Sequence, residues 1–154
     1  MSDEFWRDFG NPYLVPVAKL LLAAACGAFV GWEREVRVKA AGLRTHMLLA
    51  VGACLFALVT TRLNVNDLTR LVQGMLTGAG FIAAGVIFRQ GPSVHGLTTA
   101  AGLWVMTGIG MAVGLGEYFL GVAATVFMFL VMSSFRRIER RIPHHPDGEE
   151  EPPP

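Results

Sequence analysis

The polar residues best suited to chemistry lie between two long apolar runs, residues 14–32 and 45–61. Two acids, two arginines, a threonine and a histidine flank this short connection: Glu33, Arg34, Glu35, Arg44, Thr45 and His46. These side chains could form ion pairs, and His46 could sense protons because imidazole titrates near neutral pH. Two acids with a histidine could also hold a divalent cation, although their spacing fits no established cation site.

Two interpretations of these six residues stay open. If they lie buried at a membrane surface, their charges must pair, and we expect Arg34 or Arg44 to pair with Glu33 or Glu35. Composition alone favours a solvated loop, because basic residues gather in the loops on the inner side of a membrane.

Enzyme motifs are missing from the sequence. It contains no serine nucleophile elbow, no His-Glu-x-x-His zinc motif, no Cys-x-x-Cys pair and no Gly-Lys-Ser/Thr phosphate loop. Gly78-x-Gly80 lacks the third glycine of a dinucleotide fingerprint. The two cysteines, Cys26 and Cys54, lie in apolar runs away from charges that would activate a thiol. We therefore predict no catalytic residue, no metal site, no cofactor and no enzymatic activity.

The elements that must position the polar residues are five apolar runs, residues 14–32, 45–61, 71–88, 97–116 and 118–135. Each is close to the length of about 20 residues that a membrane-spanning helix needs. The composition agrees, with 53% hydrophobic and 16% charged residues, against about 25% charged in soluble domains. We predict an all-α polytopic membrane protein with five transmembrane helices. Its parts are an external segment 1–13, a membrane domain 14–135, and a basic stretch with a disordered tail over 136–154.

Basic residues are distributed unequally between the two sides of such a bundle. With the N-terminus outside, four of the thirteen lie in outer segments and nine in inner ones. The nine are Arg34, Arg37, Lys39, Arg44, Arg89, Arg136, Arg137, Arg140 and Arg141. The positive-inside rule therefore predicts an external N-terminus and a cytoplasmic C-terminus.

Glycines are concentrated within the apolar runs. On one face of a membrane helix they let a neighbouring backbone approach closely. We therefore predict helix packing at Gly27, Gly31, Gly74, Gly78, Gly80, Gly85, Gly110 and Gly114. Such faces serve contacts within one chain and between copies equally, so a homo-oligomer stays open.

Four segments, in one order, resemble the signature of the MgtC/SapB family of bacterial inner-membrane proteins. They are Glu33-Arg34-Glu35, the run from Ala41 to His46, Gly80-Phe81 with Ala84-Gly85-Val86-Ile87 and Arg89, and Gly96-Leu97-Thr98-Thr99-Ala100-Ala101 followed by Trp104. The resemblance extends over about Lys19 to Phe135 and adds Arg89 to the candidate polar cluster. It implies a five-span protein of the inner membrane that is linked to growth at low magnesium and, in pathogens, to survival inside host cells.

Two departures from the family pattern are visible. Ala83 stands where the glycine-rich stretch of the family has a glycine. Many members carry a soluble regulatory domain after the last span, and we expect no counterpart here, because only residues 136–154 follow.

The resemblance implies a regulator whose partners are the lipid bilayer and other inner-membrane proteins, including ATP synthase, and not nucleic acid. The alternative is a small ion or solute transporter or channel built on the glycine-rich runs 71–88 and 97–116. No carboxylate occurs in the last four predicted spans, which argues against a proton-coupled carrier. A channel lined by backbone carbonyls is compatible with that absence.

Overall fold

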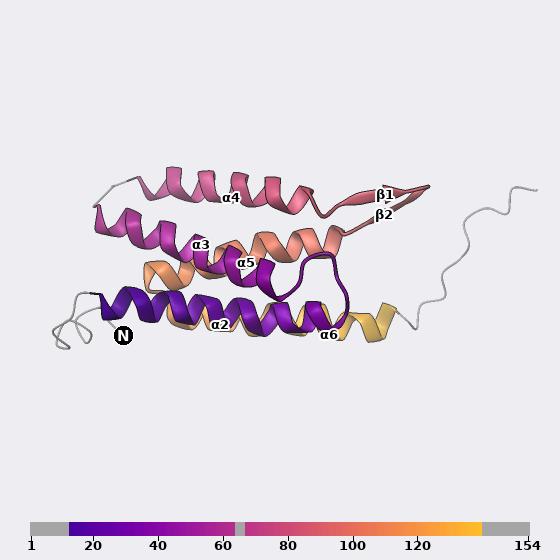
Figure 1. Cartoon of the computed structure of the whole chain (residues 1–154), viewed down its shortest axis with the longest axis horizontal. Helices are drawn as coiled ribbons and strands as arrows, with labels where there is room; N and C mark the ends of the chain where they lie inside the picture. Colours follow the sequence, from indigo (N-terminus) through magenta and orange to yellow (C-terminus); the bar gives the residue numbers. More distant parts are fainter. Residues whose placement is uncertain (1–12, 64–66, 140–154) are drawn as a thin grey trace, which may run out of the picture.

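The computed structural model describes residues 13–63 and 67–139, with side chains as far as Ser133. Five helices and one hairpin make up this part of the chain, and the helices run side by side along the long axis (Figure 1). The elements are α2 (Leu14–Val36), α3 (Leu43–Arg62), α4 (Leu68–Ala84), β1 (Phe88–Gln90), β2 (Ser93–His95), α5 (Leu97–Leu115) and α6 (Tyr118–Glu139). The all-α prediction is confirmed. The predicted external segment, up to residue 12, and the predicted tail from residue 140 lie outside the described residues.

Three helices, α2, α3 and α5, are long and apolar enough to cross a membrane. α6 contains a shorter apolar stretch, Tyr118–Ser133. The 17 residues of α4 rise about 26 Å, less than a hydrocarbon core of about 30 Å. Large apolar side chains such as Leu21, Phe119 and Phe127 are exposed, as expected for helices surrounded by lipid. The count of five crossings stays a prediction.

α5 is the central helix of the bundle. It packs against α2, α3, α4 and α6. A helix that is apolar on all sides is buried on all sides, and α5 accordingly carries Met106, Ile109 and Val113 fully inside the core. Small residues of the neighbouring helices, including Ala23 of α2 and Ala50 of α3, complete this core.

Glycines of α2 bring it against α3. A Cβ added at Gly27 would lie 2.7 Å from the carbonyl oxygen of His46, and one added at Gly31 would lie 2.8 Å from the Cα of Leu43. Both distances are shorter than side chains allow, so the two helices touch backbone to backbone. This contact sets the start of α3 beside the end of α2.

Glycines of α5 make the matching contact on the other side of α3. A Cβ at Gly110 would overlap the carbonyl group of Ala50, and a Cβ at Gly114 would lie 2.7 Å from the carbonyl oxygen of Cys54. Because these two glycines are four residues apart, they lie on one face of α5. α3 is therefore held between two glycine faces.

The glycines of α4 make no close contact with another helix of the described chain, so the predicted helix packing at Gly74, Gly78 and Gly80 stays a prediction. Cβ atoms added at Gly74, Gly78 and Gly80 would meet no atom of the described chain within 4 Å. α4 instead approaches α5 through alanine, with Ala83 packed against Leu103, and it contacts α3 only weakly. The glycine face of α4 is thus open.

The end of α4 also differs from the prediction, which continued the third span to Phe88. The helix ends at Ala84, and Gly85 serves as its C-cap rather than as a helix contact. β1 and β2 then form an antiparallel hairpin in which Phe88 pairs with His95. The connection between the strands holds Gly91 at a φ of 60°, a conformation that glycine adopts without steric cost.

Lys19 is buried near the opposite end of the bundle, with 7% of its surface exposed. Its Nζ donates a hydrogen bond to the carbonyl oxygen of Gly114 at 3.3 Å and lies 5.5 Å from the centroid of the Tyr118 ring. Carbonyl groups at the C-terminal end of a helix attract cations. Lys19 therefore ties α2 to the connection between α5 and α6.

Candidate functional site: a buried polar cluster

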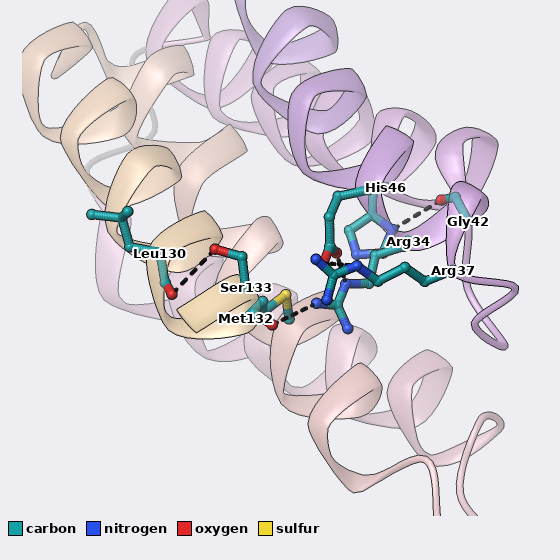
Figure 2. Close-up of polar contacts among 8 residues, drawn as sticks. Arg34, Arg37, Gly42, His46, Leu130, Met132 and Ser133 are labelled. Atoms are coloured by element: carbon teal, nitrogen blue, oxygen red, sulfur yellow. Dashed lines mark hydrogen bonds and ion pairs between the residues drawn. The ribbon is translucent and has the colours of Figure 1, made fainter. Parts of the chain in front are cut away.

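Three residues of the predicted polar cluster are buried where α2 ends and α3 begins (Figure 2). Glu33, Arg34 and His46 expose 9%, 3% and 0% of their surface. The solvated-loop interpretation therefore does not hold for these three side chains. Ionised groups taken out of water need partners, because the desolvation of an unpaired charge costs several kcal/mol.

Glu33 is the centre of the ion pairs. Its Oε2 lies 2.6 Å from Arg34 Nε, and its Oε1 lies 2.7 Å from Arg37 Nε. The carboxylate oxygens and Arg34 Nε are not aligned as hydrogen bonds, so these contacts are ion pairs. Arg37 is absent from the predicted cluster, which is a correction: α2 continues to Val36, four residues past the apolar run. Glu33 and Arg37 consequently lie one turn apart on the same face.

Arg34 links this group to the last helix. Its Nη2 donates a hydrogen bond to the carbonyl oxygen of Met132 in α6 at 3.3 Å, as Figure 2 shows. One guanidinium therefore contacts both Glu33 at the end of α2 and the backbone of α6. We call Glu33, Arg34 and Arg37 the ion-pair group.

His46 is fixed against the connection between α2 and α3. Its Nδ1 donates a hydrogen bond to the carbonyl oxygen of Gly42 at 2.9 Å, since a carbonyl oxygen can only accept. Its Nε2 is buried and has no hydrogen-bond partner among the described residues. With Nδ1 protonated, a neutral imidazole carries its free lone pair on Nε2.

Glu35 is exposed, but its side chain bridges the segment between α2 and α3. Its Oε2 accepts a hydrogen bond from the Leu43 amide at 2.9 Å, and this amide belongs to the first turn of α3, where N–H groups lack helical partners. A Cβ at Gly42 would overlap that carboxylate oxygen. Gly42 thus leaves the space in which Glu35 caps α3.

The remaining predicted members, Arg44, Thr45 and Arg89, do not join the cluster. Arg44 is exposed and makes no ion pair in the described part of the chain. Thr45 is half-buried, without a hydrogen bond from its hydroxyl to any described residue. Arg89 lies on β1 and its Nε donates to the carbonyl oxygen of Gly91 at 2.9 Å, within the hairpin. Including these three in one cluster is corrected here, because the exposed face of α3 and the hairpin carry them.

The family-like segment from Gly96 to Trp104 forms the start of α5. Gly96 has a φ of 90°, and a Cβ there would overlap the carbonyl oxygen of Val86, so only glycine fits this approach to the end of α4. Thr99 and Ala100 are buried, whereas the exposed members are Leu97, Thr98, Ala101 and Trp104.

The cluster joins helices and leaves one imidazole nitrogen unused. Among the described residues, no three His, Cys, Asp or Glu side chains gather closely enough to hold a metal ion. Sequence reasoning missed Arg37, although its i, i+4 spacing from Glu33 was a usable signal. It also missed the Met132 carbonyl, because a backbone acceptor in another helix leaves no trace in the sequence.

The fold and this cluster define an all-helical membrane protein in which a buried ion-pair group joins α2 and α6. The chain belongs to the MgtC family, which its residues 20–141 match. The resemblance found in the sequence is thereby confirmed.

Several relatives are close in sequence. YhiD of Escherichia coli strain K12, named as a proposed magnesium transporter, is 41% identical over 136 residues, which are 82% of this chain and 63% of YhiD. Protein MgtC of Salmonella typhimurium strain LT2 is 39% identical over 139 residues, 90% of this chain and 59% of that protein. Protein SrpB of Synechococcus elongatus is 37% identical over 137 residues, 79% of this chain and 75% of SrpB. The chain thus spans about three fifths of the length of YhiD and MgtC. No solved structure matches the chain.

Proposed function

We propose that this protein is a non-enzymatic regulator in the bacterial inner membrane that acts by binding other membrane proteins. The observation that carries the proposal is an apolar groove of about 560 Å³ between α3 and α4. We call it the glycine groove, and the residues of its wall that the argument uses are Leu48, Gly52, Phe56, Gly74, Gly78 and Ile82.

The chemistry of the glycine groove suits a transmembrane helix. Cβ atoms added at Gly52, Gly74 and Gly78 would meet nothing within 4 Å in the described chain, so another backbone can approach there. Helices in lipid associate through such close packing, because lipid tails are as apolar as leucine and give no hydrophobic driving force. The polar lining is limited to Arg70 and Thr107, which disfavours a polar solute as the occupant.

The rest of the bundle keeps one wall of the groove in place. α3 lies between the glycine faces of α2 and α5, and Glu35 caps its first turn. α4, in contrast, contacts α3 only weakly. A partner helix seated in the groove would therefore meet one fixed wall and one wall that can adjust.

The family resemblance supplies the first candidate partner, ATP synthase, and the first candidate condition, growth at low magnesium. In this proposal the chain crosses the inner membrane five times with its C-terminus in the cytoplasm. The names of the relatives YhiD and MgtC are consistent with a role connected to magnesium.

Transport of magnesium by the chain itself is less well supported. A path for a cation needs ionisable or polar groups at depth. Among the described residues, the buried charged side chains lie toward the two ends of α2, Lys19 near its start and Glu33 with Arg34 near its end. Glu33 is occupied by two arginines.

The test compares Gly78→Leu with Gly80→Leu. Both glycines lie on α4 and face open space, but only Gly78 lines the groove. A photo-crosslinking residue at Leu48, in native membranes at low magnesium, should label a subunit of ATP synthase. Gly78→Leu should abolish that labelling and slow growth at low magnesium, whereas Gly80→Leu should retain both.

Two results would overturn this proposal. Equal labelling in the two variants would mean that the glycine groove does not bind the partner. Robust magnesium flux through the purified protein in liposomes would make it a transporter.

A further inference from the structure

A second cavity has a volume of about 720 Å³, and residues of the hairpin line part of it. Figure 1 shows the end of the bundle at which this hairpin lies. The wall of the cavity is built from the end of α2 and the loop after it, β2, the start of α5, and α6. The polar residues of this wall are Arg34, Lys39, His95, Thr98 and Thr99. We call it the basic cavity, because the described residues that line it include two cationic side chains and no acidic one.

Arg34 brings a guanidinium to the basic cavity, and the ion-pair group to which it belongs has two arginines for one glutamate, so positive charge stays in excess. The Arg34 side chain is 3% exposed and is held by Glu33 and by the Met132 carbonyl. Guanidinium is the side chain best suited to oxyanions because it presents several N–H donors in a planar fork. Lys39 adds a second cation from the loop.

The N-terminus of α5 opens into the same space. Gly96, the N-cap, provides no side-chain cap, and the first helical hydrogen bond runs from the Ala100 amide to the Gly96 carbonyl at 2.9 Å. The amides of Leu97, Thr98 and Thr99 therefore have no acceptor in the described part of the chain. Three free N–H groups at a helix N-terminus attract an anion.

The hydroxyl of Thr99 is a second, independent observation that points to a ligand in this cavity. Thr99 is 5% exposed and lines the basic cavity, yet its hydroxyl has no hydrogen-bond partner among the described residues. The buried threonines Thr107 and Thr125 instead donate to the carbonyls four residues earlier in their helices, at 3.1 and 2.8 Å. Thr99 has no such hydrogen bond, because the residue four positions before it, His95, lies in β2 and not in a preceding helical turn.

The geometry points to a binding site for a phosphate group in the basic cavity, held by the α5 amides, the Thr99 hydroxyl, Arg34 and Lys39. A phosphate group offers several acceptor oxygens in a tetrahedral arrangement, and the cavity supplies donors from the end of α2, the loop after it and the start of α5. Two sources share this chemistry, the headgroup of an anionic phospholipid and a free phosphate in solution. The inference does not depend on the glycine groove.

The experiment titrates the purified full chain, in neutral detergent, with two probes followed by calorimetry. One probe is short-chain phosphatidylglycerol, with short-chain phosphatidylcholine as its zwitterionic comparison, and the other is inorganic phosphate. Thr99→Val removes only the hydroxyl, and Thr99→Ser restores it. Lys39→Gln removes a lining charge, whereas Arg44→Gln removes an exposed charge at the same end of the bundle that does not line the cavity.

We expect Thr99→Val and Lys39→Gln each to weaken binding at least about tenfold, while Thr99→Ser and Arg44→Gln stay near the unmodified protein. Binding of phosphatidylglycerol alone assigns the site to a lipid, and binding of inorganic phosphate that competes with it assigns the site to a soluble ligand. If Thr99→Val does not fold, the site is tested by comparing the affinity of Lys39→Gln with that of Arg44→Gln. No binding of either probe, or equal losses in Lys39→Gln and Arg44→Gln, would overturn the site.

Discussion

Glu33 holds two guanidinium groups at one end of the bundle, and it is the only acidic side chain buried in the described part of the chain. Its role follows from the free-energy cost of leaving a buried charge without its partner. A buried ion pair adds little by itself, but removing one partner leaves the other charge desolvated and unpaired. Arg34, at 3% exposure, is largely removed from water.

The first prediction concerns this carboxylate. Glu33→Gln keeps the shape of the side chain but leaves Arg34 without its counter-charge, and we expect a loss of about 3 to 5 kcal/mol in the free energy of unfolding. Arg44→Gln is the control, because that exposed side chain makes no ion pair in the described chain, and its effect should stay within about 0.5 kcal/mol. Denaturant unfolding in detergent measures both. Similar values would mean that the ion-pair group is hydrated.

The second prediction separates the two arginines. Arg34 is buried and also donates to α6, whereas the Arg37 side chain is 31% exposed and makes one ion pair among the described residues, the i, i+4 pair with Glu33. Arg37→Gln should therefore cost about 0 to 1 kcal/mol, and Arg34→Gln several times more. The same unfolding assay ranks them, and a larger loss for Arg37→Gln would contradict the assigned geometry.

The residues themselves were partly predictable. Pairing of Glu33 with Arg34 is among the alternatives that the sequence offers, and the two lie next to each other at the end of an apolar run. Arg37 was missed because the apolar run ends at residue 32, while the helix continues to Val36 on hydrogen bonds that do not depend on apolar side chains. Arg44 was included wrongly, since sequence proximity does not say which face of α3 is covered.

At the scale of the elements, α3 is the helix held most tightly. Its neighbours α2 and α5 both approach it through pairs of glycines four residues apart. Such contacts leave no room for a side chain on either helix, since a well-packed interface does not relax enough to admit added atoms.

The third prediction tests the contact between α3 and α5. In Gly110→Leu the new side chain would run into the backbone of Ala50, and we expect a loss of at least about 1 to 3 kcal/mol, or no folded protein. Gly108→Leu is the matched control on the same helix, because a Cβ there meets nothing within 4 Å. Yield and thermal unfolding of the two variants provide the comparison. If Gly110→Leu folds and is as stable as Gly108→Leu, α3 lies farther from α5 than the structure indicates.

The helices themselves could be predicted with little error, because lipid demands long apolar runs with satisfied backbones. Two features could not. The glycine face of α4 looks in the sequence like those of α2 and α5, and only the path of the chain shows that nothing in the described bundle covers it. The hairpin over residues 88–95 follows a helix end at Gly85 that the apolar pattern hides, although Gly91-Pro92 was a turn signal.

At the scale of the whole molecule, most of the polar features described above gather at one end, whereas Lys19 lies near the other. The ion-pair group, the basic cavity and the hairpin lie where α2 ends and α5 begins. The positive-inside rule predicts that this end faces the cytoplasm. The orientation therefore decides which compartment can reach the basic cavity.

The fourth prediction tests that orientation. Nine basic residues inside and four outside predict that a reporter fused after Arg141 is cytoplasmic and one fused before Tyr13 is periplasmic. Paired enzymatic reporters, each active on one side of the membrane only, read out the two positions. The opposite result at both ends would invert the molecule and place the basic cavity outside the cell.

The hydrogen bond from Arg34 to the Met132 carbonyl joins residues 98 positions apart, and this spacing has a consequence for biosynthesis. Ribosomes deliver domains from the N-terminus, so α2 enters the membrane long before α6 exists. During that interval the Arg34 guanidinium lacks one of its acceptors, and the contact between α2 and α6 is unmade. α6, which is synthesised later, thus completes the environment of a charge in α2. A nascent chain that stops before α6 therefore lacks the Met132 carbonyl that Arg34 contacts in the finished protein.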